Sequence, residues 1–404
     1  MATAQARPGR NVASALLRTC SAPDSRERGD LAMLRPDEWL DLVQRAIDLR
    51  ILPLLARAVS HSGTDQLVPA QASALMEKMS REYAFLVLRR SKSIARIHSL
   101  LRDAGLRPVF LKGAALAFDV YPASSLRPSR DADILLSPAE AAEAQKVLLG
   151  TGEFAEHPGV PHARTCRHHF FPLQHGETGI AVEVHHALTD LGGWHAEERL
   201  VAMLLEDTHS VSVLGEDVAV ASPMANILHL AMHAGRASYL DNGPLTLADM
   251  HFLFEASAVD PVDALDRADE MQLGNSFAIV AALADRYGAA WVTDAVRQRC
   301  AVADAWLDAA EEAVLPTPRA LDDNKLAKRV DARVREAGPA GPLRMALKPD
   351  PKAMALEIGV DQSSPMRWLG YPLWLTRRIV RYIRLRQQRD LDRDRSFREW
   401  LKSG

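Results

Sequence analysis

Apolar residues recur at helical spacing through the N-terminal quarter of the chain. One apolar stripe begins after Pro36, and Pro53 either kinks or ends that helix or starts another one. A second stripe, from Leu75 to Leu101, predicts an amphipathic helix of about thirty residues that ends near Gly105. The aromatic and methionine side chains of this stripe are expected in the core, because they lie on its apolar face. Residues 15–105 are therefore predicted to be helical.

The period of the pattern changes in the next stretch of the chain. The short apolar run Arg107–Leu111 and the stretch Asp131–Leu136 predict buried strands. Ser137 can cap the helix that follows, because a proline and then a glutamate occupy the next positions of a capping box. Residues 168–173 and 180–188 flank a polar, glycine-containing loop, which predicts a β-hairpin.

Helical spacing returns after Pro223 and is clearest over residues 226–235 and 245–257. The stretch 316–365 is Pro-rich, charged and weakly periodic, which is typical of a loop or linker. These patterns predict an α+β fold in which a small mixed β-sheet with helices is flanked by N- and C-terminal helical regions. The expected parts are a helical region (1–105), an α/β core (106–215), a second helical region (216–315), a Pro-rich linker or irregular segment (316–366) and a basic amphipathic helix (367–404).

The composition places the chain among ordinary globular proteins. Its 404 residues are 48% apolar and 25% charged, with a formal net charge of −3. This apolar fraction is too high for a disordered chain, and a chain of this length needs no disulfide or metal to complete its core. The near-neutral balance argues against a general nucleic-acid coat protein, although it leaves room for a local basic patch.

Three cysteines, Cys20, Cys166 and Cys300, lie far apart in the sequence and form no CxxC pair. This usage gives neither a disulfide framework nor a zinc ribbon, and it is typical of a reducing cytoplasm. No run reaches the ~18 apolar residues of a membrane span, and Val12–Leu17 is too short for a signal-peptide core. A cytoplasmic location is therefore expected, with residues 1–18 as a frayed polar start.

The candidate chemistry begins with two carboxylates on one predicted strand. Asp131 and Asp133 are two residues apart, so both side chains point to the same face. Two like charges this close repel each other unless a cation lies between them, and hard divalent cations such as Mg2+ prefer carboxylate oxygens. Because an isolated Asp-x-Asp pair is common by chance, metal binding needs a further ligand to support it.

A third acid lies in the second strand of the predicted hairpin. Alternation along that strand puts Glu183 and His185 on one face, and Val182 and Val184 on the other. A buried acid is costly unless it is paired or binds a cation. If this strand neighbours the strand of Asp131, Glu183 faces the same cleft, and three carboxylates around one or two cations suit phosphoryl transfer. The alternative is that Glu183 faces solvent.

The order of these features resembles the polymerase-β type nucleotidyltransferase superfamily, and more closely its uncharacterised nucleotidyltransferase branch. In that branch a helical N-terminal region leads into a Leu-Lys-Gly motif. The resemblance covers about residues 15–260 and is most specific in the Lys-Gly, Asp-x-Asp and Glu assembly. The residues that carry it are Leu111-Lys112-Gly113, Tyr121, the run from Arg127 to Asp133, Glu183-Val184-His185, the run from Leu228 to His233, and Leu247-Ala248-Asp249.

This resemblance implies a nucleotidyltransferase-type sheet and a role for each matching residue. It implies that Asp131, Asp133 and Glu183 are catalytic and hold Mg2+ or Mn2+, with Glu183 helping to activate the attacking hydroxyl. It also implies that the backbone at Gly113 approaches the phosphates of an NTP, where no side chain obstructs it. The wider superfamily has a serine after its phosphate-loop glycine, whereas this chain has Ala114.

Cationic side chains near this glycine are further candidates for phosphate binding. Lys112 either supplies a point charge for a phosphate or ends the strand in solvent. Arg127 and Arg130 either bind phosphates or pair with nearby acids. His185 either touches the substrate, holds Glu183 by a hydrogen bond, or is structural. The expected nucleotide-binding residues are Lys112, Gly113, Ala114, Arg127 and Arg130.

Together these features predict a metal-dependent nucleotidyltransferase. The enzyme would move a nucleotidyl group from an NTP to a hydroxyl or phosphate of a peptide, protein or small-molecule acceptor, and the resemblance implies a role in natural-product tailoring. Two alternatives stay open: a catalytically silent adaptor of the same fold that binds a nucleotide or a partner, and a toxin-like transferase that acts on tRNA. The missing phosphate-loop serine motivates the first alternative, and the basic C-terminal segment is the feature on which the second depends.

Two other parts of the sequence carry chemistry-bearing residues. His229 and His233 are four residues apart, a spacing that zinc can use, but without a HExxH motif polar or packing positions explain them more simply. The C-terminal segment 367–404 mixes arginines with aromatic residues in an amphipathic pattern. It either docks on its own chain or contacts an acidic partner, nucleic acid or an anionic membrane surface. Nucleic acid is not the favoured partner.

Overall fold

The structure is a computed structural model in which two compact units are distinguished. One unit comprises Met1–Leu315 with Trp400–Gly404, and the other comprises Pro316–Glu399. All the candidate nucleotide and metal residues lie in the first unit. The structure describes residues 9–27, 29–158, 168–189, 194–316, 354, 360–361, 364–377, 380 and 391–403.

A seven-stranded mixed sheet forms the centre of the first unit, counted over the described residues, in the order β3-β4-β5-β2-β1-β7-β6. Strand β2 pairs in parallel with β5 and antiparallel with β1, and β1 pairs in parallel with β7. The α+β class and the mixed sheet predicted from the sequence are confirmed. The strands are β1 (Val109–Leu111), β2 (Asp131–Leu135), β3 (Phe154–Glu156), β4 (Leu173–His175), β5 (Ala181–His185), β6 (Thr208–Val213) and β7 (Glu216–Ala221).

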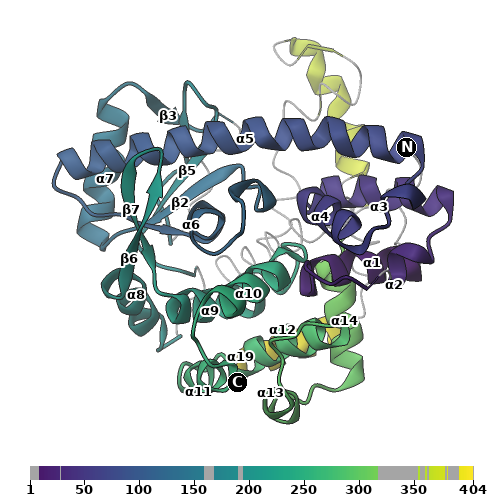
Figure 1. Cartoon of the computed structure of the whole chain (residues 1–404). Helices are drawn as coiled ribbons and strands as arrows, with labels where there is room; N and C mark the ends of the chain where they lie inside the picture. The colour runs from purple at the N-terminus through teal and green to yellow at the C-terminus, as the bar shows by residue number, and fades with distance from the viewer. Residues whose placement is uncertain are drawn as a thin grey trace. The chain divides into compact units, whose positions relative to one another are not determined.

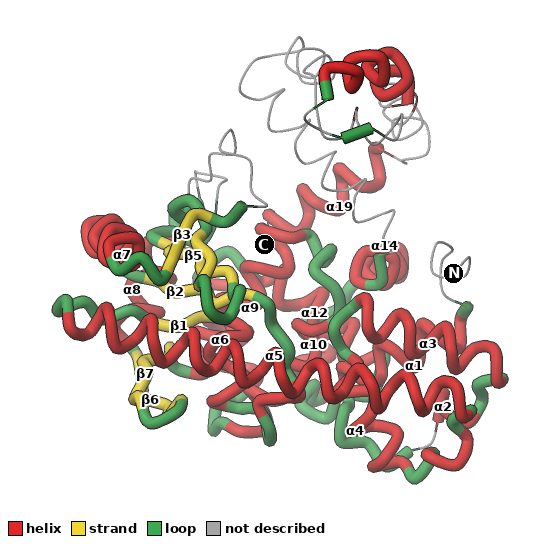
Figure 2. Tube along the Cα trace, turned by 90° about the horizontal axis from the view of Figure 1, so that it is seen from above, coloured by secondary structure: helices red, strands yellow, loops and turns green. Residues whose placement is uncertain are grey.

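The central strands alternate between a core face and a second face. Ile134 of β2 and Val182 and Val184 of β5 enter the hydrophobic core with side chains of α5 (Ala70–Asp103) and α7 (Pro138–Gly150). Figure 2 shows the strands grouped near the C-terminal half of α5, while the first helices lie near its N-terminal half. The opposite face of β2 and β5 is therefore left to carry the candidate acids.

The N-terminal helices follow the predicted apolar stripes. Pro53 lies in the first turn of a new helix, so it starts a second helix and does not kink the first. The expectation of a frayed start is wrong for residues 10–18, because they lie in a helix that buries Leu16 and Leu17. These helices, which Figure 1 shows in purple, are α1 (Arg10–Ser21), α2 (Gly29–Ala32), α3 (Pro36–Asp48) and α4 (Leu52–Ser62).

Helices also follow the first strand and the sheet. The short helix α6 (Lys112–Asp119) starts where β1 ends, and the two segments predicted after Pro223 are found as α9 and α10. The helices after the sheet are α8 (Glu197–Glu206), α9 (Pro223–Met232), the π-helix η4 (His233–Ser238), α10 (Leu245–Ala256), α11 (Pro261–Glu270), α12 (Gly274–Arg286), α13 (Asp294–Arg299) and α14 (Asp304–Val314). The 3₁₀ helices are η2 (Asp65–Leu67), η3 (Ser124–Leu126) and η6 (Pro365–Gly370).

The expected linker 316–366 and the expected basic helix 367–404 lie partly outside the described residues. Residues 371–377 are helical, residues 381–390 are not described, and α19 (Leu391–Ser403) ends the described chain. The side-chain amide of Asn275 donates to the Trp400 carbonyl at 2.8 Å, which fixes the end of α19 within the first unit. None of the described helices combines the length and the hydropathy needed to cross a membrane.

Candidate active site

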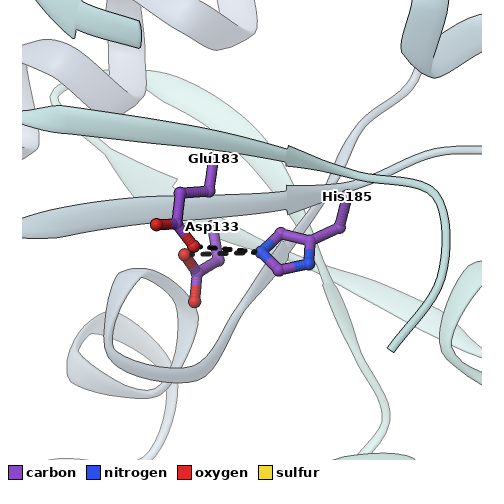
Figure 3. A group of neighbouring side chains, drawn as sticks. All are labelled: Asp133, Glu183 and His185. Atoms are coloured by element: carbon purple, nitrogen blue, oxygen red, sulfur yellow. Dashed lines mark ion pairs between the residues drawn. The ribbon is translucent and has the colours of Figure 1, made fainter. Parts of the chain in front are cut away.

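The register of β2 and β5 brings the candidate acids together. The two strands run in parallel, and their register places Asp133 directly opposite Glu183 and Leu135 opposite His185. Side chains alternate along each strand, so Asp133, Glu183 and His185 share the face that points away from the α5 and α7 side of the sheet. Figure 3 shows the three side chains converging from the two neighbouring strands. The geometry thus places Glu183 beside Asp133 and not in isolation at the surface.

The His185 imidazole lies within ion-pair distance of both carboxylates. Its Nε2 atom lies 3.5 Å from Glu183 Oε2 and 3.7 Å from Asp133 Oδ1 (Figure 3). Both Asp133 Oδ1 and His185 Nε2 are buried, and neither has a hydrogen-bond partner among the described residues. Buried polar atoms are normally paired, so two orphaned atoms that face each other indicate a position for a missing partner. Glu183 keeps about a third of its side chain exposed, which leaves this position accessible.

Lys112 supplies the positive charge of the site. Its Nζ atom lies 3.0 Å from Asp133 Oδ2, and it comes from the junction between β1 and α6. The backbone of Lys112 has a φ of 48°, the left-handed conformation that residues other than glycine seldom adopt. Such conformations persist where the surrounding structure imposes them. The sequence left solvent exposure and charge supply as alternatives for Lys112, and the structure shows an ion pair with a catalytic candidate.

The pKa values of these groups follow from burial and mutual attraction. Burial disfavours the charged form of Asp133, but Lys112 and then His185 outweigh it and hold the pKa of this carboxyl well below its usual range. Burial would likewise raise the pKa of Glu183, but its contact with His185 lowers it. Burial would lower the pKa of His185, and the two carboxylates raise it above the ordinary value. Asp133 and Glu183 are therefore anionic at neutral pH.

Asp131 lies on the same strand but in a different environment. Its carboxylate accepts a hydrogen bond from the Ser129 hydroxyl. Burial, followed by repulsion from Asp133, raises the pKa of Asp131. The compact group whose ligand atoms all lie within 4.8 Å of one another consists of Asp133, Glu183 and His185, and it does not include Asp131. A cation held by all three predicted acids would therefore need the Asp131 side chain to turn.

Gly113 follows Lys112 in the first turn of α6, and packing explains why it is glycine. A Cβ atom at this position would lie 2.9 Å from the Cβ of Ser129. Ala114 is buried in the core cluster. The backbone of this turn therefore lies close to the loop that leads into β2. The N-terminus of a helix attracts anions through its unpaired N–H groups, so phosphate binding here stays a prediction that the location supports.

The two predicted arginines have different surroundings. Arg127 is largely shielded from solvent and donates two hydrogen bonds to Asp249, Nε to Oδ1 at 2.7 Å and Nη2 to Oδ2 at 2.9 Å. The hydroxyl of Tyr121 donates to the same carboxylate at 2.6 Å. Of the two alternatives left open for Arg127, pairing with an acid is therefore the one that its contacts show. Arg130 is exposed at the start of β2, where a phosphate-binding role stays a prediction.

Sequence reasoning missed several residues that surround the acids. Ser129 was assigned no role, although its hydroxyl binds Asp131. Arg50, in a turn after α3, has a φ of 62°, and its charge interacts with Asp131 while burial lowers its pKa. His229 of α9 is fully buried, and burial followed by Lys112 lowers its pKa to about 3. From sequence, a polar or packing position was the simpler explanation of His229, whereas its proximity to Lys112 depends on tertiary structure.

A divalent metal fits the residues of this site. Asp133 and Glu183 offer carboxylate oxygens, the donors that Mg2+ and Mn2+ accept. The orphaned Asp133 Oδ1 faces the group, and Asp131 adds a carboxylate two residues away. The carboxylates of Asp133 and Glu183, on neighbouring strands, repel each other. Lys112 lies within ion-pair distance of Asp133. His185 lies within ion-pair distance of both carboxylates, and a metal ion beside it would neutralise more of their mutual repulsion.

One comparison with known proteins gave a match. A family model described as "Uncharacterised nucleotidyltransferase" matches residues 35–288. The match includes the N-terminal helices from α3 onward, the whole sheet and helices α9 to α12. Neither the curated proteins nor the solved structures gave a significant match to the chain.

Proposed function

Because the chain belongs to the uncharacterised nucleotidyltransferase family, we propose that it uses a divalent metal ion, Mg2+ or Mn2+, to transfer a nucleotidyl group from an NTP. The acceptor would be a hydroxyl or phosphate on a peptide, protein or small molecule. The observation that carries the proposal is the register that sets Asp133 directly opposite Glu183 on parallel strands. This register puts two carboxylates beside the start of α6, where a triphosphate has a helix N-terminus to bind.

Each acidic residue of the site has a proposed role in the reaction. Asp133 and Glu183 would hold the metal, and Asp131 would join them if its side chain turned. When bound, the metal neutralises charge that develops on the transferred phosphoryl group. The acceptor oxygen would form a bond to the α-phosphorus while the bond to the bridging oxygen breaks and pyrophosphate leaves. Glu183, which is anionic and partly exposed, would orient an acceptor hydroxyl by a hydrogen bond and take its proton as the bond to the α-phosphorus forms.

The cations beside the acids would bind and orient the triphosphate. The backbone N–H groups at Gly113 and Ala114 lie in the first turn of α6. Lys112 begins this turn and its ammonium contacts Asp133, so the ammonium can bind both a carboxylate and a phosphate oxygen. Arg130 is exposed at the start of β2 and would meet the phosphates from the other side of Asp131. His185 would orient Glu183, because its ring lies between the two carboxylates.

The test is transfer of label from α-³²P-labelled NTPs, supplied with Mg2+ or Mn2+ and a cell extract as the source of acceptors. Asp131→Asn and Asp133→Asn should each abolish labelling while circular dichroism stays unchanged. Asp103→Asn is a matched control, because this carboxylate is exposed at the end of α5. Labelling at the wild-type rate in both site variants would refute the assignment of the acids.

A second candidate is a catalytically silent adaptor that binds a nucleotide or a partner. It is favoured by one observation: Ala114 stands where the superfamily has the serine of its phosphate loop. NTP binding that depends on the metal, measured by calorimetry, together with no labelled product in any extract, would favour the adaptor. Labelled product that disappears in Asp133→Asn would exclude it.

A further inference from the structure

The donor set at the acid cluster differs from the all-carboxylate set that the family resemblance implies. Of the two orphaned buried atoms, one is a carboxylate oxygen, Asp133 Oδ1, and the other is an imidazole nitrogen, His185 Nε2. His185 is almost completely buried, and its ring points between Asp133 and Glu183 (Figure 3). An unpartnered buried nitrogen is an uncommon feature that calls for a ligand.

The spacing of the ligand atoms around His185 Nε2 is close to that of donors around one ion. Metal–ligand bonds of about 2.0–2.2 Å place neighbouring ligand atoms ~3.0–3.5 Å apart. The observed separations from His185 Nε2 are 3.5 Å to Glu183 Oε2 and 3.7 Å to Asp133 Oδ1. These separations are ion-pair distances that are too long for good hydrogen bonds, so a shared ion would satisfy the lone pairs that direct pairing leaves without a hydrogen bond. Lys112 contacts the other oxygen of Asp133, Oδ2, and leaves Oδ1 available.

A second imidazole lies beside the first, with the ring centroids of His169 and His185 5.1 Å apart. His169 Nε2 is 3.9 Å from Glu183 Oε2, while its Nδ1 lies 2.6 Å from the Phe170 carbonyl oxygen. A carbonyl oxygen only accepts, so Nδ1 carries the proton and the lone pair of Nε2 faces the acids. Metal-binding histidines typically have this arrangement, in which the second ring nitrogen donates to a backbone carbonyl.

We infer that Asp133, Glu183 and His185 form a site for a first-row transition metal ion such as Mn2+ in preference to Mg2+, and that His169, which contacts Glu183, becomes a fourth ligand if its side chain moves toward the group. Imidazole is a preferred ligand of the later first-row transition metals. Mn2+ accepts it alongside carboxylate oxygens, whereas Mg2+ strongly prefers oxygen ligands and keeps several waters. The inference rests on the proposed function only in that it specifies the metal of the same site. It does not require an NTP or an acceptor.

The test measures metal binding to the full chain without nucleotide. After treatment with EDTA and dialysis, Mn2+ is added and its free concentration is followed by electron paramagnetic resonance. We expect one Mn2+ per chain at this site, and displacement of half of it should need at least a tenfold excess of Mg2+. Pulsed measurements on the bound Mn2+ should show coupling to ¹⁴N, the direct signature of a histidine ligand.

Variants identify the nitrogen. His185→Gln should weaken Mn2+ binding at least tenfold and reduce the ¹⁴N coupling, and the double variant with His169→Gln should remove the coupling. His186→Gln is the matched control, since this ring packs on Phe170 and is not one of the ligands. A result on the wild-type protein alone can overturn the inference. It is wrong if the bound Mn2+ shows no ¹⁴N coupling, or if an equal concentration of Mg2+ displaces it.

The outcomes also separate this inference from the proposed function. Nucleotidyl transfer that runs on Mg2+ alone, in protein whose Mn2+ shows no nitrogen coupling, would overturn the inference and leave the function standing. Conversely, Mn2+ bound through His185 in a protein that transfers no nucleotide would support the inference and count against the function.

Discussion

The ion pair between Lys112 and Asp133 makes a quantitative prediction about stability. Lys112→Met removes the ammonium that lies 3.0 Å from Asp133 Oδ2 and keeps an unbranched side chain of similar length. The Asp133 carboxylate stays buried and loses its nearest cation. Because a buried charge without its partner is costly, the free energy of unfolding of the variant should fall by about 2–4 kcal/mol.

This magnitude follows from the geometry. Two unit charges 3.0 Å apart attract each other by about 5.5 kcal/mol at an effective dielectric constant of ~20. Part of this attraction is offset in the wild type, because the Lys112 side chain is only 22% exposed and its ammonium has lost water. His185 takes over another part, since its Nε2 lies 3.7 Å from the other oxygen of Asp133. The expected fall in the free energy of unfolding of Lys112→Met is therefore at the lower end of the values measured for broken buried ion pairs.

The assay is urea unfolding at pH 7, followed by tryptophan fluorescence. The double variant Lys112→Met with Asp133→Asn is the matched control, since it removes the charge as well as its partner and should regain most of the loss. A loss below about 1 kcal/mol in the single variant would refute the reasoning, as would a double variant no more stable than the single one.

The same pair fixes the sign of the pH dependence. The pKa of Asp133 is lowered by folding, so its stabilisation is complete above the ordinary carboxyl value of about 3.9 and is lost as pH falls through the folded pKa. The pKa of Lys112 is raised, so the stabilisation is present below about pH 10.4 and is lost as pH rises through the folded value. The difference between wild type and Lys112→Met should therefore be greatest between these limits and shrink outside them.

Three further changes test other parts of the structure. Gly113→Ala should lower the free energy of unfolding by about 1–3 kcal/mol, because its Cβ would overpack the neighbouring loop, whereas Gly150→Ala meets no atom within 4 Å and should be neutral or slightly stabilising. Asp249→Asn should lower the free energy of unfolding by about 3 kcal/mol, measured by thermal melting, because it breaks the ion pair with Arg127. His229 has a folded pKa of about 3 and an unfolded value near 6.5, so it lowers stability as pH falls between these values, and His229→Gln should flatten that part of the stability curve.

Each of these three has a clear contrary result. Equal melting temperatures for Gly113→Ala and Gly150→Ala would show that the turn at α6 has room. A loss under about 1 kcal/mol in Asp249→Asn would mean that Arg127 finds another partner or reaches water. An unchanged pH profile in His229→Gln would show that this imidazole is not held neutral by its surroundings.

Periodicity and local motifs were sufficient to predict the elements whose stability is local. The apolar stripe ending near Gly105 predicted α5, because a long helix repeats one pattern over many turns. Ser137 and Glu140 predicted the start of α7, where the structure shows both hydrogen bonds of the capping box. Alternation in β5 predicted the shared face of Glu183 and His185, since the period of two is a property of the strand itself.

Long-range pairing set the limit of the prediction. Arg127 pairs with Asp249, 122 residues further along the chain, and no local pattern could identify this partner. The β6–β7 hairpin was not predicted, although it adds the strand that pairs in parallel with β1. The left-handed backbone of Lys112 was also missed, because the sequence has no glycine there to indicate it. That single dihedral belongs to the residue whose side chain meets Asp133.

The two oxygens of Asp133 connect the stability prediction with the metal inference. Oδ2 faces Lys112, and Oδ1 is the orphaned atom near His185. An ion bound through Oδ1 would not have to displace the ammonium, so Lys112→Met should change Mn2+ affinity by less than tenfold, in the direction of tighter binding, because one nearby positive charge is gone. If the ammonium instead occupied the position of the ion, the wild type would bind Mn2+ only after moving Lys112. The variant would then gain a hundredfold or more in the same resonance titration, and the two cations of the site would be competitors.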